Sequence, residues 1–341
     1  MAPRLSICVP TNHGRALVLA AALDSILAQL PDCPTAVEIV VSDNASADAS
    51  AEVVASRARR HPGLLAYRRN ERDLGFAANL RAAVEHARGD FCWLLGSDDA
   101  ITPGGLERVL RALRAEPSLT GLSFARENRD ALLERPAFPD PPSLLPAVLA
   151  QERHYGALRP ALQDLGLYLT YLSAHVTRRP ELLDVLRDAP RQVVDPGHFL
   201  HLYAFSRLLA QRPDWRWLPE RIVLNRTVND TLVQALDGQV AAYQAVTQRD
   251  RARAWTQALG AEGEELSLLR HASRGHFASA RAILGYKLGP SHTWREDVLL
   301  LRTFARGFAA VPAFWSASFP ALLVPHRLAK LLRQQLRLRP V

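Results

Sequence analysis

Short apolar runs alternate with longer segments of mixed polarity through the first 125 residues. Runs bounded by polar or turn residues are typical of strands covered on both faces in a parallel sheet. Regular alternation of strand and helix predicts an α/β fold, with helices wrapped around that sheet. The predicted strands are 5–9, 37–41, 64–69, 91–95 and 119–125, and the predicted helices are 15–30, 47–60, 75–88 and 104–115.

The pattern changes in the second part of the chain. Prolines between Pro136 and Pro146 predict a loop over 126–150. From 231 onward, long segments rich in Ala, Leu and Arg predict helices only. In between, the sequence predicts strands at 167–177, 215–218 and 222–224 and a helix at 199–209. We therefore expect a domain at 1–228, with halves at 1–125 and 126–228, and a helical C-terminal extension at 229–341.

The net charge of +8 favours anionic partners such as phosphates, nucleic acid or an acidic membrane surface. No zinc, helix-turn-helix or aromatic-basic signature supports nucleic acid, so we expect no nucleic-acid partner. Three cysteines (Cys8, Cys33 and Cys92) lack metal-ligand spacing and predict buried thiols in a reducing compartment. The longest apolar segment, 308–324, contains Pro312 and Pro320 and is too short for a membrane span. These features predict a cytoplasmic protein.

The strand predicted at 91–95 leads into Gly96-Ser97-Asp98-Asp99. Ligands of open α/β sheets bind at the carboxyl ends of the strands, which is where these two carboxylates fall. Hard oxygen ligands there suit Mg²⁺ or Mn²⁺ bridging to substrate phosphates. A solvated turn before a helix is the alternative interpretation.

Three more polar segments follow predicted strands: 10–15, 42–46 and 70–79. Asp43 in the second could accept hydrogen bonds from a base or a ribose, or it could cap a helix. In the third segment, Leu74-Gly75-Phe76 opens a helix whose N-terminus could face a ligand. Each segment alone is weak evidence, but all four lie on one edge of one sheet.

Together these segments resemble the family 2 glycosyltransferases, whose fold is GT-A, a Rossmann-like nucleotide-diphospho-sugar transferase fold. The motifs that match are Ser6–Thr11, Val41–Ser46, Asn70 with Leu74–Phe76 and Asn79, and Trp93–Asp99. The Leu-Leu-Gly-x-Asp-Asp form is similar to the abequosyltransferase-like branch, which builds bacterial surface polysaccharides. The resemblance implies a sugar transfer from a nucleotide-diphosphate donor to a saccharide or lipid-linked saccharide, with inversion.

The resemblance also implies roles for individual residues. Asp98 would be the leading metal ligand, and Asp99 would help to place donor or acceptor. Gly96 stands where the family usually has another carboxylate, so this chain offers the ion one acid fewer. On the nucleotide side, the implied residues are Pro10, Thr11, Asp43, Asn79 and Ser97.

The general base is less defined by the resemblance. Inverting members usually carry an Asp on or just before a helix downstream of the metal motif. Here the helix pattern places His201 at that position, and histidine has a suitable unperturbed pKa of about 6.5. Asp195 is the competing candidate, unless it caps the helix, and His201 packed in the core is the other alternative. Trp215 and Trp217 alternate on one predicted strand and could stack on sugars or fill the core.

Leu323 to Arg339 mixes leucines with Lys and Arg and follows a segment containing Phe314, Trp315 and Phe319. This composition is typical of a helix lying on an anionic membrane surface, and equally of a terminal helix packed on its own protein. The first interpretation predicts peripheral attachment to the inner membrane. A non-catalytic homologue that binds nucleotide sugar or acts as a scaffold is the alternative function.

Overall fold

The computed structural model describes residues 3–30, 36–142, 144–195, 197–227, 240–288 and 292–332. Backbone contacts divide the chain into two compact units, Met1–Val228 and Asn229–Val341. Each unit is described by itself below.

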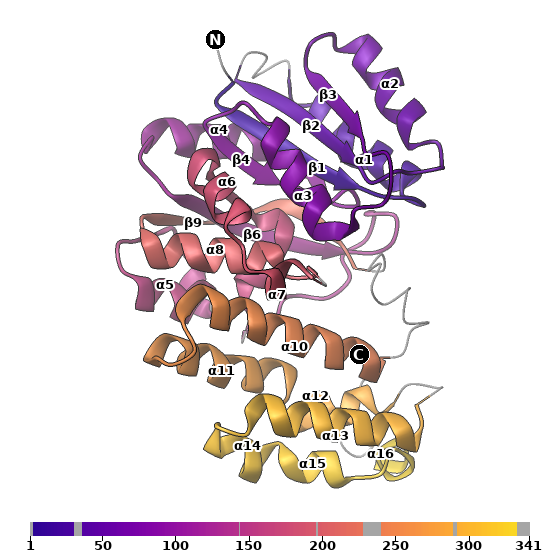
Figure 1. Cartoon of the computed structure of the whole chain (residues 1–341), viewed down its shortest axis with the longest axis vertical. Coiled ribbons are helices and arrows are strands. Elements are labelled where there is room, and N and C mark those ends of the chain that lie inside the picture. Colours follow the sequence, from indigo (N-terminus) through magenta and orange to yellow (C-terminus); the bar gives the residue numbers. More distant parts are fainter. Residues whose placement is uncertain are drawn as a thin grey trace. The chain divides into compact units, whose positions relative to one another are not determined.

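The first unit is built on one mixed sheet (Figure 1). Along the sheet the strands follow the order β3-β2-β1-β4-β8-β6-β9-β5, and β7 pairs with β9. The four strands β1 to β4 run parallel, whereas β8 is antiparallel to both of its neighbours. The strands are β1 (Leu5–Thr11), β2 (Val37–Asp43), β3 (Leu65–Arg69), β4 (Phe91–Leu94), β5 (Ala100–Ile101), β6 (Gly121–Arg129), β7 (Arg153–Tyr155), β8 (His175–Arg178) and β9 (Trp215–Arg226).

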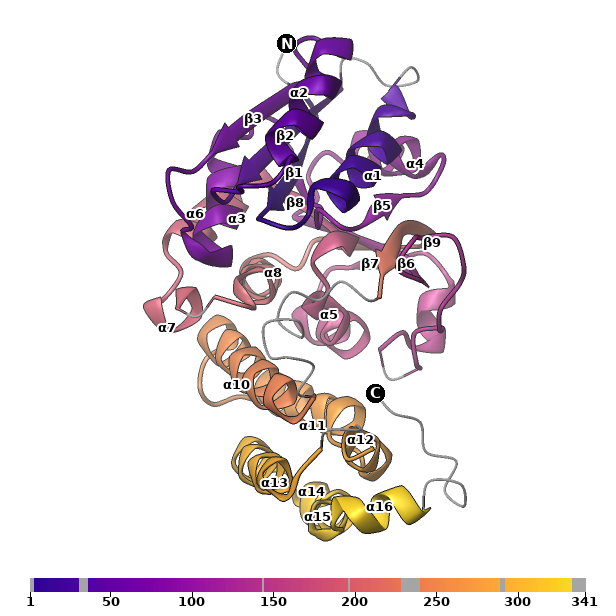
Figure 2. The same cartoon turned by 90° about the vertical axis from the view of Figure 1, so that its right-hand side faces the viewer.

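Helices cover both faces of this sheet. Figure 2 shows α3 and α6 on one face and α1 and α4 on the other. All residues of β1, β2 and β4 are buried, which explains why these strands are mostly apolar in sequence. The helices of this unit are α1 (Ala16–Leu27), α2 (Ser50–Arg60), α3 (Gly75–His86), α4 (Gly105–Ala115), α5 (Leu158–Leu165), α6 (Arg179–Arg187), α7 (Arg191–Val194) and α8 (Leu200–Gln211), with 3₁₀ turns η2 (Ala147–Ala150), η3 (Tyr168–Thr170) and η4 (Leu172–Ala174).

The alternation predicted for the first part of the chain is confirmed, strand by strand and helix by helix. Cys8 and Cys92 are buried free thiols, as expected. Cys33 lies outside the described residues.

Two predictions for the second half need correction, and one open alternative is decided. The strand predicted over 167–177 is wrong for most of its length, because 3₁₀ turns precede a strand that begins at His175. The two short strands predicted near 215–224 are one continuous strand, β9. Trp215 and Trp217 are fully buried, and their indole N–H groups donate to Ser123 Oγ and to the Leu149 carbonyl, both at 2.8 Å. Both rings therefore belong to the core and are closed to a sugar.

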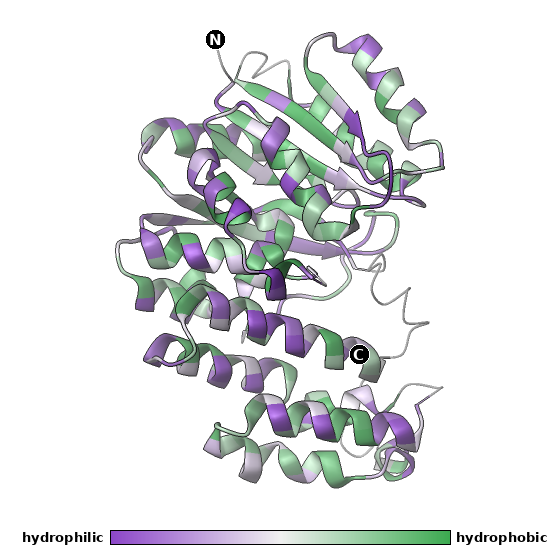
Figure 3. Ribbon diagram, viewed as in Figure 1, coloured by the Kyte–Doolittle hydropathy of each residue, from purple (hydrophilic) through white to green (hydrophobic). Residues whose placement is uncertain are grey.

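The second unit consists of helices alone over the residues that are described. Figure 3 shows apolar and polar residues interspersed along these helices. Its core includes Leu300, Phe304, Phe308 and Phe314. No helix in the described part of the chain is long and apolar enough to cross a membrane. The helices are α10 (Val240–Leu259), α11 (Glu264–Phe277), α12 (Ala280–Tyr286), α13 (Trp294–Phe308), α14 (Pro312–Ala317), α15 (Phe319–Leu323) and α16 (His326–Leu332).

Candidate active site

The carboxyl ends of β1, β2 and β3 are joined by backbone hydrogen bonds. Thr11 lies opposite Asp43 in the parallel register. Just beyond the strands, the Asn44 N–H donates to the Thr11 carbonyl at 2.9 Å, and the Asn70 N–H donates to the Asp43 carbonyl at 2.8 Å. The polar segments that follow these strands therefore meet at one edge of the sheet.

Asn79, near the start of α3, holds two strand ends together. Its side-chain NH₂ donates to the Thr11 carbonyl at 3.1 Å and to the Ser42 carbonyl at 3.0 Å. Its side-chain oxygen accepts from Ser42 Oγ at 2.8 Å and from the Asn70 side chain at 3.0 Å. The residue is buried, so its amide supports this edge of the sheet from within the protein.

Asp43 is also engaged within the protein. The carboxylate is fully buried and accepts from the Ser46 N–H at 2.9 Å, from Ser46 Oγ at 2.5 Å and from the Tyr67 hydroxyl at 2.5 Å. Burial and the neighbouring Asp43 charge raise the pKa of Tyr67, so its proton remains on the phenol. Asp43 thus fixes the turn after β2 and the side chain of Tyr67.

The start of α3 is also held by hydrogen bonds within the protein. The Leu74 N–H donates to the Asn44 side-chain oxygen at 2.9 Å, and the Gly75 N–H donates to Asp73 Oδ1 at 2.7 Å. Asp73 also accepts from the Asn44 side chain. These contacts satisfy N–H groups that we expected to face a ligand. Phe76 and Leu74 remain partly exposed beside them.

Thr11 has a different environment. Its side chain is buried, and its hydroxyl oxygen has no hydrogen-bond partner among the described residues. A buried polar atom without a partner is uncommon and points to a missing ligand or water. Pro10, the residue before it in β1, is buried as well.

Asp98, in the turn after β4, pairs with Arg15. The Arg15 guanidinium lies 2.9 Å from Asp98 Oδ2, and the side chains are 16% and 18% exposed. Arg15 precedes α1, where the helix dipole disfavours a cation. Arg15 was not among the site residues expected from the sequence. A basic residue just before a helix is nevertheless a signal of an acidic partner. Ser97, the residue before Asp98, is buried.

Asp99 is buried and saturated with hydrogen bonds. Oδ2 accepts from the Tyr171 hydroxyl at 2.7 Å and from Ser173 Oγ at 2.5 Å, while Oδ1 accepts from the Arg226 N–H at 3.1 Å. Burial, with the neighbouring charge of Asp98, raises the pKa of Asp99 to about 7. Asp99 therefore joins the turn after β4 to the end of β9 and to the 3₁₀ turns.

Gly96 leaves room for these carboxylates. A Cβ there would lie 3.0 Å from Asp98 Oδ1 and 3.2 Å from both Asp99 Oδ2 and Ser173 Oγ. The turn at Gly96 is therefore tightly packed and offers little space for a side chain, including the carboxylate that the family usually has at this position.

The two candidates for the general base differ in exposure. His201 is buried on α8, its Nε2 lies 3.0 Å from the Thr170 carbonyl, and its Nδ1 has no partner. Burial lowers the pKa of His201 to about 4, so the imidazole is neutral and only weakly basic. Asp195 is exposed at the end of α7.

The segment that follows Asp195 packs against the start of α3. Gly197 has φ +79°, and a Cβ there would lie 2.6 Å from the Cβ of Ala77. The ring of His201 lies edge-on to that of Phe76, with centroids 6.2 Å apart. This packing brings the start of α8 next to the start of α3.

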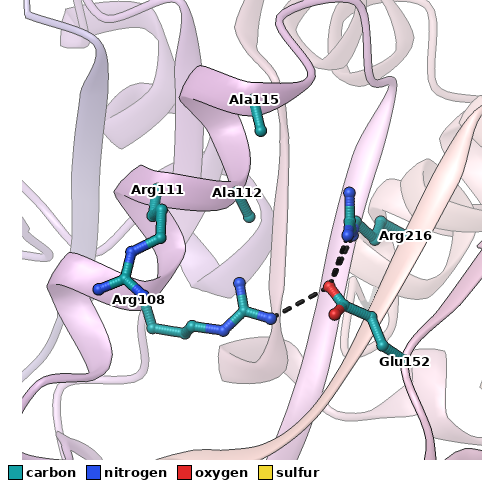
Figure 4. A pocket seen from close by; sticks show the side chains of 6 residues that line it. All are labelled: Arg108, Arg111, Ala112, Ala115, Glu152 and Arg216. Carbon is teal, nitrogen blue, oxygen red and sulfur yellow. Dashed lines mark hydrogen bonds and ion pairs between the residues drawn. The ribbon is translucent and has the colours of Figure 1, made fainter.

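A separate shallow pocket of about 360 Å³ lies over α4 and β9 and shares no residue with the strand-end site (Figure 4). Glu152 accepts from both Arg108 and Arg216 there, and Glu220 binds Arg108 as well. The arginines are thus already paired with acids, and we assign no function to this pocket.

A known protein family matches the part of the chain that holds the four polar segments. The family described as "Glycosyl transferase family 2" matches residues 6–164, which contain all four polar segments. Residues 6–164 of the chain are thus similar to the family 2 glycosyltransferases. The family resemblance noted in the sequence is confirmed over these residues, whereas Asp195 and His201 lie beyond them.

One curated relative is the abequosyltransferase RfbV of Salmonella typhimurium, which is 38% identical over 102 residues. That match covers 30% of this chain and only 30% of the relative.

Solved structures match over much more of the chain. Staphylococcus aureus TarS 1-349, in complex with UDP-GlcNAc, has a TM-score of 0.64 at 16% identity, covering 97% of this chain and 92% of that one. The mannosyltransferase PcManGT of Pyrobaculum calidifontis, in complex with GDP-Man and Mn²⁺, has a TM-score of 0.57 at 19% identity, covering 99% and 86%. The predicted GT-A fold is thus confirmed.

Of the residues at this site, Asp98 is the one that suits a divalent ion. Among the described residues, no group of three or more His, Cys, Asp or Glu side chains could hold a metal by itself. Asp98 is partly exposed and offers hard oxygen atoms. Mg²⁺ is commonly bound through one or two carboxylates together with substrate phosphates and waters, and Asp98 suits that arrangement.

Proposed function

We propose that this chain is a glycosyltransferase that moves a sugar from a nucleotide-diphosphate donor to a saccharide or lipid-linked saccharide, in the synthesis of a bacterial surface polysaccharide. The observation that carries the proposal is the meeting of four polar segments around Asp98 at one sheet edge, inside a family 2 glycosyltransferase domain. Buried Asp43 and Asn79 support that edge from within, and Thr11 offers it an unpartnered hydroxyl.

The proposed reaction uses Asp98 to hold a Mg²⁺ or Mn²⁺ ion, which when bound would neutralise charge on the leaving diphosphate. Asp99 holds the turn that presents Asp98. The relation to RfbV and the solved complexes with UDP-GlcNAc and GDP-Man support a nucleotide-sugar donor.

We propose Asp195 as the general base of an inverting transfer. Its carboxylate is exposed beside the start of α8, whereas His201 is buried and has a pKa of about 4. A base needs both access to the acceptor hydroxyl and a pKa near the working pH. The burial of His201 favours packing against Phe76 over proton transfer.

We further propose that the second unit attaches peripherally to an anionic inner-membrane surface on the cytoplasmic side. Trp315, Leu323, Leu328 and Leu331 are exposed on α14 to α16, at 46%, 59%, 44% and 78%, and Arg327 and Lys330 are exposed among them. Exposed apolar and basic side chains together are typical of an interfacial helix. Residues 333–341 of the basic tail lie outside the described residues.

A vesicle-binding experiment tests this attachment. The protein should sediment with vesicles rich in phosphatidylglycerol at low salt, and Leu331→Glu should weaken that binding. Leu17→Glu, at an exposed leucine of α1, is the matched control. Binding that does not change with lipid charge or with Leu331→Glu would contradict the attachment.

A thermal-shift experiment tests the donor site. UDP, CDP, GDP and dTDP are added in turn, with and without Mn²⁺, to the wild type and to Asp98→Asn. A nucleotide at about 100 times its Kd should add roughly 2.7 kcal/mol of stability. We expect a metal-dependent shift with one nucleotide that Asp98→Asn loses.

The matched control is Asp90→Asn, an exposed aspartate before β4, at the other end of the strand from Asp98. No shift with any nucleotide would contradict the proposal. A nucleotide-sugar that binds but is neither transferred nor hydrolysed, with saccharide acceptors supplied, would favour the non-catalytic alternative.

A further inference from the structure

Arg15 and Asp98 form an ion pair in the part of the site that would receive the diphosphate. The pair joins the loop after β1 to the turn after β4, and its N–O distance of 2.9 Å is that of a charge-assisted hydrogen bond. Neither side chain is fully buried, so both can be reached by a ligand.

The backbone of Arg15 is fixed independently of this pair. Asp48 Oδ2 accepts from the N–H groups of Gly14 at 2.7 Å, Arg15 at 3.0 Å and Ala16 at 3.3 Å. Gly14 has φ +85°, a conformation that glycine adopts readily. The loop is thus held in place even if the Arg15 side chain leaves Asp98.

The carboxylates of the site are already compensated. Asp98 faces the Arg15 guanidinium, and Asp99 accepts three hydrogen bonds within the protein. A divalent ion arriving alone would have to compete with a guanidinium for one carboxylate. A nucleoside diphosphate changes that balance, because its oxygen atoms attract both the ion and an arginine fork.

We propose that Arg15 is an exchangeable counter-ion: it neutralises Asp98 while no nucleotide is bound, and moves to the diphosphate when the nucleotide arrives, leaving Asp98 to the divalent ion. This inference rests on the proposed function and assigns Arg15 as a diphosphate-binding residue. It follows that the ion and the nucleotide bind together, and that free metal ion binds weakly.

The test measures free and bound Mn²⁺ by electron paramagnetic resonance, and nucleotide affinity by calorimetry with UDP, CDP, GDP and dTDP. Without nucleotide, Arg15→Gln should bind Mn²⁺ about tenfold more tightly than the wild type, since a charge-assisted hydrogen bond no longer competes. With Mn²⁺ present, the same variant should bind the nucleotide about tenfold more weakly.

Two further variants sharpen the experiment. Arg15→Lys keeps the charge without the planar fork, so it should keep the weak binding of free Mn²⁺ and lose part of the nucleotide affinity. Arg57→Gln removes a comparable pair, with Arg57 Nη2 at 2.6 Å from Asp24 on α1, and should change neither affinity.

The outcomes separate the two proposals. If Arg15→Gln binds free Mn²⁺ no more tightly than the wild type, or binds the nucleotide equally well, the exchange is overturned while the donor site stands. If the wild type binds no nucleotide with Mn²⁺ present, the proposed function fails and the exchange fails with it.

Discussion

The hydroxyl of Ser173 donates to Asp99 Oδ2 at 2.5 Å across a sequence separation of 74 residues. The same hydroxyl accepts from the Gly96 N–H at 2.9 Å, and the Ser173 carbonyl accepts from the Trp93 indole at 2.7 Å. Ser173 thus links the strand and turn that carry Asp98 to the second half of the first unit.

Ser173→Ala should lower the free energy of unfolding by about 1–3 kcal/mol, because a buried carboxylate and a backbone N–H each lose a partner. Urea unfolding measures the change. Ser206→Ala is the matched control, because Ser206 is equally buried and its hydroxyl has no hydrogen-bond partner. Equal losses in the two variants would contradict the role of Ser173.

Asn79→Ala should destabilise more than a single hydrogen-bond deletion. It removes four hydrogen bonds at a buried site, at a cost of about 1–3 kcal/mol for each polar group that is left unsatisfied. Ser42→Ala removes only one of the four and should cost less. Chemical unfolding of both variants measures the two losses of stability. A larger loss in Ser42→Ala than in Asn79→Ala would contradict the role of Asn79 in holding the two strand ends together.

Gly96→Ala should destabilise by about 1–3 kcal/mol, since its Cβ would crowd Asp98, Asp99 and Ser173. Gly156→Ala provides the comparison, because a Cβ at Gly156 meets nothing within 4 Å. Differential scanning calorimetry of the two variants measures the contrast. A Gly96→Ala protein as stable as Gly156→Ala would show that the turn has more room than the structure indicates.

Buried histidines should make the protein less stable in mild acid. Burial lowers the pKa of His201 to about 4 and that of His175 to about 3, below the value of about 6.5 expected in the unfolded chain. Between these values the unfolded state binds more protons at these two groups, so their contribution to stability is full above about pH 6.5 and falls as the pH drops towards 4.

Each of these groups contributes a slope of up to about 1.4 kcal/mol per pH unit. His201→Gln should remove one such contribution, and His271→Gln, at an exposed histidine of α11, should not. Urea unfolding at several pH values between 4 and 7 measures both slopes. An unchanged slope in His201→Gln would contradict the burial of a neutral imidazole.

Asp195→Asn should lower kcat by about 10²–10⁴-fold, the range typical of a lost general base, and leave nucleotide affinity unchanged. Turnover is measured with the nucleotide sugar whose nucleotide gives the thermal shift. Asp188→Asn serves as control, because Asp188 is also exposed at the end of a helix, α6. A large kcat loss in His201→Asn with none in Asp195→Asn would reassign the base.

Much of the first unit could be predicted from the sequence because its determinants are local. Buried parallel strands are mostly apolar, and β1, β2 and β4 are buried along their whole length. The turn residues that follow them are polar, and the carboxyl ends of parallel strands share one edge. The prediction of a strand over 167–177 was wrong because a buried apolar segment can form turns as well as a strand. The spacing of apolar residues does not distinguish the two structures.

The sequence by itself determined the α/β architecture, the family resemblance and the sheet edge that carries Thr11, Asp43, Asn79 and Asp98. Only the tertiary structure decided what each side chain does there. Asp43 accepts from Tyr67, Asn79 donates to the end of β1, and Asp98 faces Arg15. These partners are 24 to 83 residues apart and carry no local signal, because their contacts depend on how distant segments meet at one sheet edge.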